Sequence, residues 1–113
     1  MVKSFKQGDI IQMDFDPTLG HEQNGRRPAL VVSNATFSKI CNLTFVCPIS
    51  NTVNKHPLHV NLNSKTKTKG TIKCEQLKAC DLEKRNAKFI EKLPDELTKE
   101  AIDILIGIIE NNS

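Results

Sequence analysis

The stretch AKFIEKLPDELTKEAIDILIGIIEN, residues 87–111, contains the change of pattern that decides the fold class. Its first part is typical of a short strand, and Pro94 then begins the one convincing helix, because proline suits a first helical turn. Asp95 and Glu96 complement the helix dipole, and Asn111 is a stop signal. The apolar residues of the predicted helix recur at helical spacing; they are Leu97, Ala101, Ile104, Leu105 and Ile108.

This apolar stripe is wider than one sheet face usually covers. Ile102, Ile106 and Ile109 lie beside the residues at helical spacing and extend the stripe. We therefore expect these three isoleucines to pack within the domain or against a partner.

The rest of the chain is a series of short apolar or alternating segments. Strands are predicted over 8–15, 29–32, 43–49, 58–62, 71–77 and 87–93, with one helical turn over 35–40. Residues 18–27 are polar and contain Asn24-Gly25, which predicts a long exposed loop, and 64–70 is predicted as a basic turn. Many short strands and one terminal helix predict an α+β fold built on a small, strongly bent antiparallel sheet or barrel.

Length and composition fit one domain spanning 1–113. The chain has 113 residues, 38% of them hydrophobic, which is too apolar for disorder. The formal charge of +3 permits a nucleic acid or an acidic protein partner without demanding either. The longest apolar run, 104–109, is far shorter than a bilayer span, and no secretory signal is recognised, so the cytoplasm is the expected location.

The four cysteines form no C-x-x-C pair and sit among strand-like residues. They are Cys41, Cys47, Cys74 and Cys80. We expect buried free thiols rather than disulfides or a zinc site.

Several segments from about Gly8 to Arg85 together carry a family resemblance. These are Gly8-Asp9-Ile10, Asp14-Phe15-Asp16-Pro17-Thr18, Gly20-His21-Glu22-Gln23, Arg27-Pro28-Ala29-Leu30-Val31-Val32-Ser33, Pro48-Ile49-Ser50, Gly70-Thr71-Ile72, Glu75-Gln76 and 81–85. In their order and spacing these segments resemble the MazF/PemK family of toxins.

The resemblance implies an SH3-like β-barrel of the CcdB/PemK type with a C-terminal helix, and a homodimer. It also implies a toxin that cleaves single-stranded RNA at short recognition sequences with neither a metal ion nor a cofactor. Such toxins are paired with a cognate acidic, MazE-like antitoxin, which suits the positive charge, and DNA would be bound only through the antitoxin complex.

Metal-free cleavage of RNA by its own 2′-hydroxyl needs a base, a cation for the phosphorane oxygens and a donor to the leaving oxygen. Glu22 is the candidate base, although a loop glutamate is usually just solvated, and the resemblance favours the functional role. His21 is the other possible base. Arg27 precedes Pro28 and can contact a phosphate with two donors, although Arg26 could take the role if the register shifts.

Ser50 is the candidate hydroxyl, because it follows Pro48-Ile49 at a predicted strand end. It could donate to a non-bridging oxygen or to the leaving oxygen, and the alternative is a local turn-forming serine. Candidates for reading unstacked bases are Thr18, His21, Gln23, Asn24, Asn51 and Gln76. His56 and His59 have no neighbouring ligand in the sequence, so no metal site is predicted.

Two other functions remain open at this point. A CcdB-like toxin of the same fold would poison DNA gyrase without catalysis, with exposed isoleucines of the C-terminal helix as its contacts. A degenerate family member would act only as a partner for the antitoxin. The set of Glu22, Arg27 and Ser50 favours the nuclease, because a pure binding protein needs no such trio.

Overall fold

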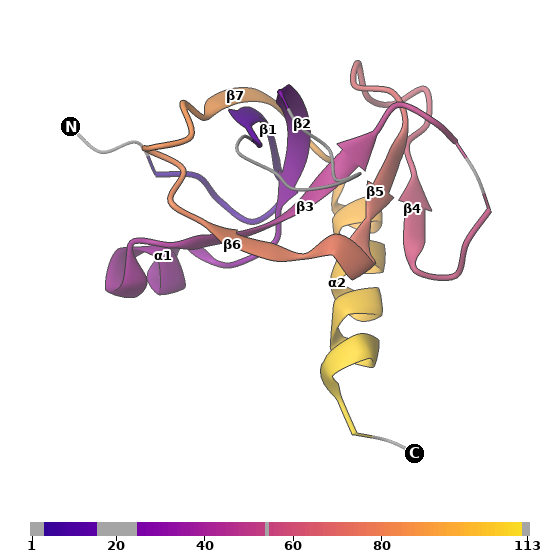
Figure 1. Ribbon diagram of the computed structural model, residues 1–113. Coiled ribbons are helices and arrows are strands. Elements are labelled where there is room, and N and C mark those ends of the chain that lie inside the picture. Colours follow the sequence, from indigo (N-terminus) through magenta and orange to yellow (C-terminus); the bar gives the residue numbers. More distant parts are fainter. Residues whose placement is uncertain (1–3, 16–24, 54, 112–113) are drawn as a thin grey trace.

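The computed structural model describes residues 4–15, 25–53 and 55–111, and it has an α+β fold (Figure 1). The strands are β1 (Asp9–Asp14), β2 (Arg26–Val31), β3 (Thr44–Ser50), β4 (His59–Asn61), β5 (Thr71–Lys73), β6 (Lys78–Cys80) and β7 (Lys88–Lys92). The helices are α1 (Ala35–Cys41), the 3₁₀ turn η1 (Cys74–Gln76) and α2 (Asp95–Ile109). The predicted combination of short antiparallel strands and one long C-terminal helix is confirmed.

The strands form one bent sheet in the order β4-β5-β3-β2-β1-β7, and β6 pairs separately with β3. Every pairing between these strands is antiparallel. The register of β1 against β7 shifts between Ile10 and Ile11, and such a bulge increases the local bend of a sheet. The small strands β4 and β5, at the other end of the sheet, lie at an angle to β1 and β7 (Figure 1).

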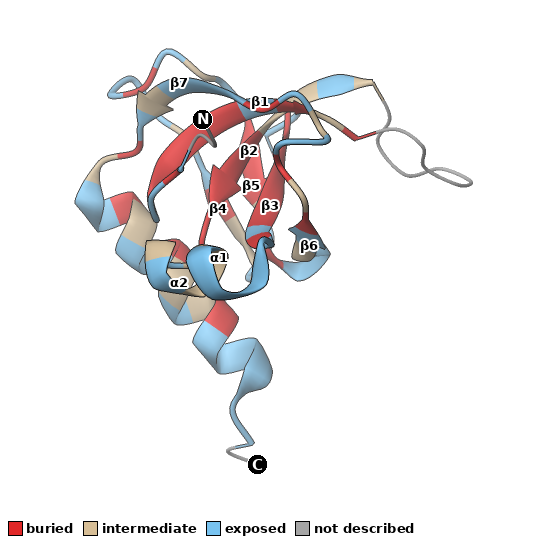
Figure 2. Cartoon of the chain, turned by 90° about the vertical axis from the view of Figure 1, so that its left-hand side faces the viewer, coloured by how far each residue is buried: buried red, intermediate tan, exposed pale blue. Residues whose placement is uncertain are grey.

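Strand alternation sorts the buried side chains into two clusters on opposite faces of the sheet. One cluster packs against α2 and includes Ile10, Leu30, Cys47, Ile49, Val60 and Ile72 with Leu97, Ala101 and Leu105 of the helix. The other contains Ile11, Met13, Ala29, Val31 and Val46, and is covered by Phe5 and Leu82. Central strands are therefore buried on both faces (Figure 2).

Helix α2 begins and ends close to the predicted positions. Pro94 precedes its first residue, and Asp95 and Glu96 lie in the first turn, as expected. The expected packing of its wide apolar stripe within the domain is confirmed for one of the three added isoleucines, and packing of the other two against a partner stays a prediction. Ile102 is partly buried against the core, but Ile106 and Ile109 are exposed in this chain, because the helix extends beyond the edge of the sheet (Figure 1).

Three other expectations are corrected. Arg26 and Arg27 belong to β2 rather than to a loop, since β2 continues the hairpin with β1 as far as the Asp14–Arg26 pair. The segment predicted as a strand over 71–77 is interrupted by η1. Cys41 is exposed at the end of α1, whereas the other three cysteines are buried free thiols as expected.

Leu43 and Phe45 do not share the burial of Cys47, although alternation places all three on one face. The reason is that the cluster under α2 reaches Cys47 but not the beginning of β3. Among the described residues, no helix is long and apolar enough to cross a membrane.

Candidate active site

The two adjacent arginines of β2 point to opposite faces of the sheet, which separates their roles. Arg26 pairs with Asp14 across the hairpin, with Nη1 3.1 Å from Oδ1 of Asp14, and its Nη2 donates to the carbonyl of Asn86 at 2.6 Å. Asn86 itself donates to the other carboxylate oxygen of Asp14 at 2.8 Å. The hydrogen bonds from Asn86 and then Arg26 lower the pKa of Asp14. Arg26 therefore stabilises the end of the hairpin.

Arg27 lies on the other face, the one opposite α2. Its pair in β1 is Met13, and the next residue on that face of β2 is Ala29, which is buried on the side away from the helix. Arg27 is half-buried. Because Arg26 is engaged on the opposite face, the structure favours Arg27 over Arg26 as the arginine that would contact a substrate.

Ser50 lies on the same face at the end of β3. The β2–β3 ladder includes the Ala29–Pro48 pair, and Arg27 and Ser50 each stand two residues beyond it on neighbouring strands. Ile49 points into the cluster under α2, so alternation turns Ser50 to the opposite face. The fold thus brings together Arg27 and Ser50, which are far apart in the sequence, at one end of one sheet face.

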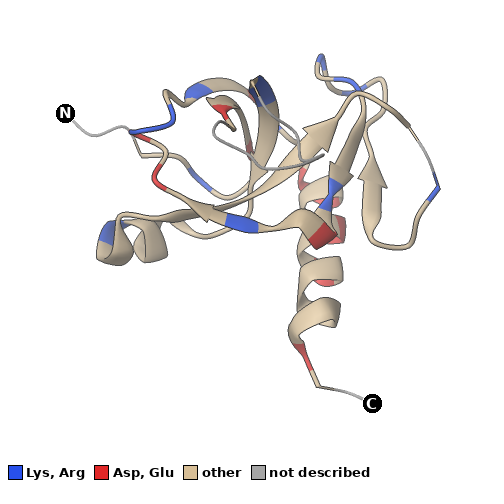
Figure 3. Cartoon of the chain, in the orientation of Figure 1, with Lys and Arg blue, Asp and Glu red and all other residues tan. Residues whose placement is uncertain are grey.

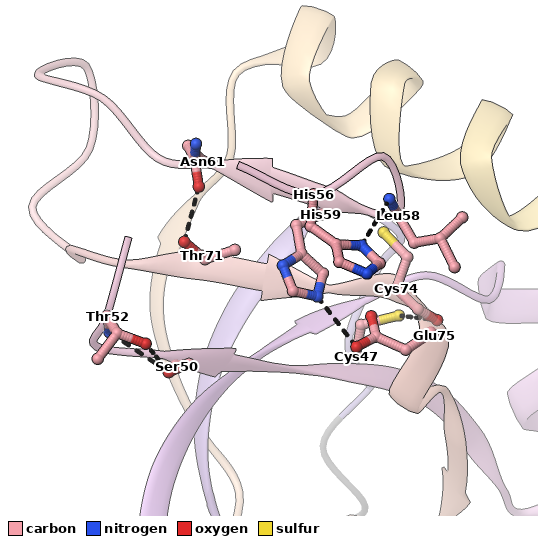
Figure 4. A network of polar contacts seen from close by, with 10 residues as sticks. All are labelled: Cys47, Ser50, Thr52, His56, Leu58, His59, Asn61, Thr71, Cys74 and Glu75. Carbon is pink, nitrogen blue, oxygen red and sulfur yellow. Dashed lines mark hydrogen bonds and ion pairs between the residues drawn. The ribbon is translucent and has the colours of Figure 1, made fainter. Parts of the chain in front are cut away.

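Two contacts fix Ser50 in place. Its Oγ is 2.9 Å from Oγ1 of Thr52 and accepts the Thr52 N–H at 3.3 Å, which is the local serine turn considered as the alternative role (Figure 4). Behind it, Gly70 has a φ of +121°, and a Cβ there would stand only 1.8 Å from the Ser50 carbonyl oxygen. The hydroxyl is pre-positioned by its turn, and a phosphate oxygen could replace Thr52 as its partner.

Of the remaining candidates, the structure describes Asn51 and Gln76. Thr18, His21, Glu22, Gln23 and Asn24 lie outside the described residues. Asn51 directly follows Ser50 and is exposed, and Gln76 is exposed at the end of η1. The described residues hold no group of three histidines, cysteines or acids placed for a metal ion.

The structure also brings together residues that the sequence had left apart. The rings of His56 and His59 stack with centroids 4.3 Å apart, and Nε2 of His59 is 3.0 Å from Oε2 of Glu75 in η1 (Figure 4). Burial alone would raise the pKa of Glu75, but the hydrogen bond with His59, a backbone hydrogen bond and the charges of the two histidines together outweigh it, and the pKa is lowered. The only sequence signal for this cluster was the spacing His56-Pro57-Leu58-His59.

Charge is distributed unevenly around the sheet. Helix α2 carries Asp95, Glu96, Glu100 and Asp103 with Lys99 as its one basic residue. Arg27 and Lys73 lie on strand positions of the opposite face. Acidic residues therefore outnumber basic ones on α2, while basic residues are spread over strands, loops and α1 (Figure 3). An anionic ligand is expected to approach the face opposite α2.

Comparison with known proteins gives consistent matches over almost the whole chain. Residues 6–109 match the family described as PemK-like, MazF-like toxin of type II toxin-antitoxin system. The chain is 37% identical to the endoribonuclease toxin ChpB of Escherichia coli K12, covering 97% of this chain and 100% of that protein. It is 32% identical to the endoribonuclease PemK of Escherichia coli, covering 92% and 81%.

Solved structures of related proteins share the fold of this chain. The crystal structure of MazF from Deinococcus radiodurans superposes with a TM-score of 0.87 at 27% identity, covering 96% of this chain and 98% of that one. A crystal structure of a MazE-MazF complex from the same organism gives a TM-score of 0.83 at 27% identity, covering 96% and 97%.

Proposed function

Since the chain belongs to the family of PemK-like, MazF-like toxins of type II toxin-antitoxin systems, we propose that it is an endoribonuclease toxin acting on single-stranded RNA without a metal ion. The relatives that the chain matches over most of their length are named as endoribonucleases. The observation that carries the proposal is the position of Arg27 and Ser50 at one end of the sheet face opposite α2, two residues beyond the same strand pair.

In the proposed reaction the 2′-hydroxyl of one ribose attacks the adjacent phosphorus, and the bond to the 5′-oxygen of the next nucleotide breaks. Glu22, or His21, takes the proton of the attacking hydroxyl. The Arg27 guanidinium stabilises the charge that develops on the non-bridging oxygens. Ser50 donates a hydrogen bond to a non-bridging oxygen or to the leaving oxygen. The products are a 2′,3′-cyclic phosphate and a 5′-hydroxyl.

The test is to incubate purified protein with a long single-stranded RNA in EDTA and map the new ends. We expect discrete cuts that disappear in Arg27→Ala and are slowed about 10²-fold or more in Glu22→Ala and Ser50→Ala, as when a transition-state donor is removed. Arg26→Ala is the matched control, because Arg26 lies on the other face beside Asp14. It should keep the cuts in its folded fraction.

Three outcomes contradict the proposal. They are intact RNA with folded wild-type protein, unchanged cleavage by Arg27→Ala, and loss of cleavage in folded Arg26→Ala but not in Arg27→Ala. Intact RNA together with trapped gyrase–DNA complexes would instead support the non-catalytic gyrase poison.

We also propose that the toxin works in the cytoplasm and is inhibited by an acidic antitoxin, which binds the face opposite α2 in competition with RNA. The MazE-MazF complex of the Deinococcus relative supports a partner of this kind, and so does the concentration of acidic residues on α2 rather than on that face. An excess of the cognate antitoxin should stop cleavage at a stoichiometric ratio.

A homodimer through the end of α2 is the third part of the proposal. Ile106, Ile108 and Ile109 are exposed there, and such a group of large apolar side chains is typical of a contact surface. Ile106→Asp should convert a dimer to a monomer in sedimentation velocity. Ile40→Asp is the control, since Ile40 is 76% exposed on α1. A monomeric wild-type protein would contradict this part.

A further inference from the structure

The chain has no tryptophan or tyrosine, so any base-stacking surface must come from phenylalanine, histidine or arginine. Among the described residues, one pair of stacked imidazoles lies near Ser50. We propose that His56 and His59, held by Glu75, form the platform on which one unpaired base of the RNA stacks. The inference rests on the proposed function and assigns part of its substrate site.

The platform lies on the same sheet face as Ser50. Ser50 pairs with Thr71 across β3 and β5, and Thr71 pairs with Asn61 across β5 and β4. Ile49, Ile72 and Val60 in these strands are buried under α2, so alternation places Ser50, Thr71 and Asn61 on the opposite face. His59 is two residues from Asn61 on the same strand and shares that face.

The spacing of the strands gives the distance between Ser50 and His59. Neighbouring strands lie about 4.8 Å apart, and two residues span about 7 Å along a strand. The Cα atoms of Ser50 and His59 are therefore separated by roughly 12 Å, within reach of a short single strand of RNA. A strand with its phosphate at Ser50 and Arg27 could place a nearby base on the imidazoles.

The geometry turns a ring face outward and fixes it. The His59 side chain is only 6% exposed, whereas His56 is an exposed residue, so His56 is the outer member of the stack. Nδ1 of His56 accepts the Leu58 N–H at 3.1 Å, which holds the edge of the ring against its own loop.

Glu75 acts through His59 and is a positioning residue. The 3.0 Å contact between its Oε2 and Nε2 of His59 fixes the orientation of the inner ring (Figure 4). Lys73 is the cross-strand pair of His59 and supplies a positive charge for the neighbouring phosphate.

The experiment measures binding separately from cleavage. The probe is a fluorescein-labelled pool of single-stranded 2′-O-methyl RNA, which has no free 2′-hydroxyl and cannot be cut, and the readout is fluorescence anisotropy. His56→Ala should raise Kd about tenfold, because stacking of a base on an aromatic side chain contributes roughly this much. His56→Phe should restore binding, and Glu75→Gln, which keeps a hydrogen bond to His59, should bind better than Glu75→Ala.

Phe89→Ala is the matched control, because Phe89 is another exposed aromatic residue, on β7. Its Kd should equal that of the wild type. On cleavable RNA, His56→Ala should raise KM with little change in kcat, as expected for a residue that binds the substrate without contacting the cleaved bond.

Two results would overturn the inference. One is an unchanged Kd for folded His56→Ala, and the other is failure of His56→Phe to restore binding, which would indicate a role for charge or hydrogen bonding. If the wild type binds the pool through His56 but cuts no RNA, the platform stands and the proposed nuclease fails. If the wild type cuts RNA and His56→Ala binds and cuts RNA as the wild type does, the proposed nuclease stands and the platform fails.

Discussion

The two faces of the bent sheet have the same strand alternation but carry different side chains. On the face under α2, the strands contribute a cluster of buried apolar side chains that includes Ile10, Leu30 and Ile72. The opposite face is apolar only where Phe5 and Leu82 cover it, and beyond that cover it carries Arg27, Ser50 and His59. A sheet face becomes a core where apolar side chains pack under another element, and polar side chains at the end of the opposite face can form a site.

The end of the opposite face that carries Ser50, here called the polar end, is nevertheless held by specific contacts. Thr71 is fully buried and donates to Asn61 at 2.7 Å, and Gly70 packs its backbone against that of Ser50. The loop before it is held by Glu91, whose carboxylate accepts the backbone N–H groups of Lys67 and Thr68 and the Thr68 hydroxyl. This end therefore depends on hydrogen bonds and close backbone contact, where the helix face depends on apolar burial.

The largest effect is expected at Gly70. Gly70→Ala would place a Cβ 1.8 Å from the Ser50 carbonyl oxygen at a φ of +121°, so β3 and β5 must separate. We expect a loss of about 3 kcal/mol or more in the free energy of unfolding, measured by urea denaturation. Gly25→Ala is the control, since Gly25 also has a positive φ of +79° but no atom within 4 Å, and it should cost only about 1–2 kcal/mol. An equal loss of stability in the two variants would show that β3 and β5 separate at Gly70 with little loss of free energy.

The helix face should respond to lost volume. Leu105→Ala removes a buried side chain of α2 and should cost about 2–3 kcal/mol in urea unfolding, while cleavage per folded molecule stays unchanged. Ile40→Ala, on the exposed surface of α1, should stay within about 0.5 kcal/mol of the wild type. If Leu105→Ala altered cleavage in the folded fraction, the two faces would not be independent.

The loop attachment at Glu91 predicts a pH dependence. Burial alone would raise the pKa of Glu91, but the hydrogen bonds from Thr68 and the loop backbone outweigh it and lower the pKa in the folded protein. A lowered pKa contributes stability at neutral pH that is lost as the pH falls below about 4.5 and through the folded value. Glu91→Gln should be about 1 kcal/mol less stable at pH 7. The difference should vanish in acid, and a difference that persisted at pH 2 would contradict it.

The smallest effect is expected for Thr71→Val. The substitution keeps the shape of a buried side chain but removes its hydrogen bond to Asn61. We expect a loss of about 1 kcal/mol or less, because the exposed Asn61 amide can bind water instead. A gain in stability on thermal unfolding would show that this polar contact serves the site rather than the fold.

Patterns within single elements were predicted well, because they depend on local chemistry. Pro94 with two acidic residues located the start of α2, and the alternation of residues 58–62 located β4. The prediction failed where pairing decided the outcome. Arg26 and Arg27 are typical of a loop by polarity, but the hairpin with β1 extends through them. Leu43 and Phe45 have a strand pattern, yet both stay more than a third exposed, although the Phe37 ring of α1 packs against Phe45.

For the candidate site, too, the residue types were predicted from the sequence, but the contacts between them were not. The sequence named Arg27 and Ser50 as candidates, through a resemblance and through residue chemistry, with Arg26 as the alternative to Arg27 if the register shifted. It also gave no reason to connect His56 and His59 with Glu75, since the contact joins β4 to η1 across 16 positions.

By itself, the amino-acid sequence determined the α+β class, the terminal helix and the types of side chain available for chemistry, because these follow from local periodicity and residue type. Only the tertiary structure decided which face each arginine occupies, which apolar residues are covered and which polar ones meet. Those outcomes depend on strand register, where a shift of one residue moves every side chain of a strand to the other face.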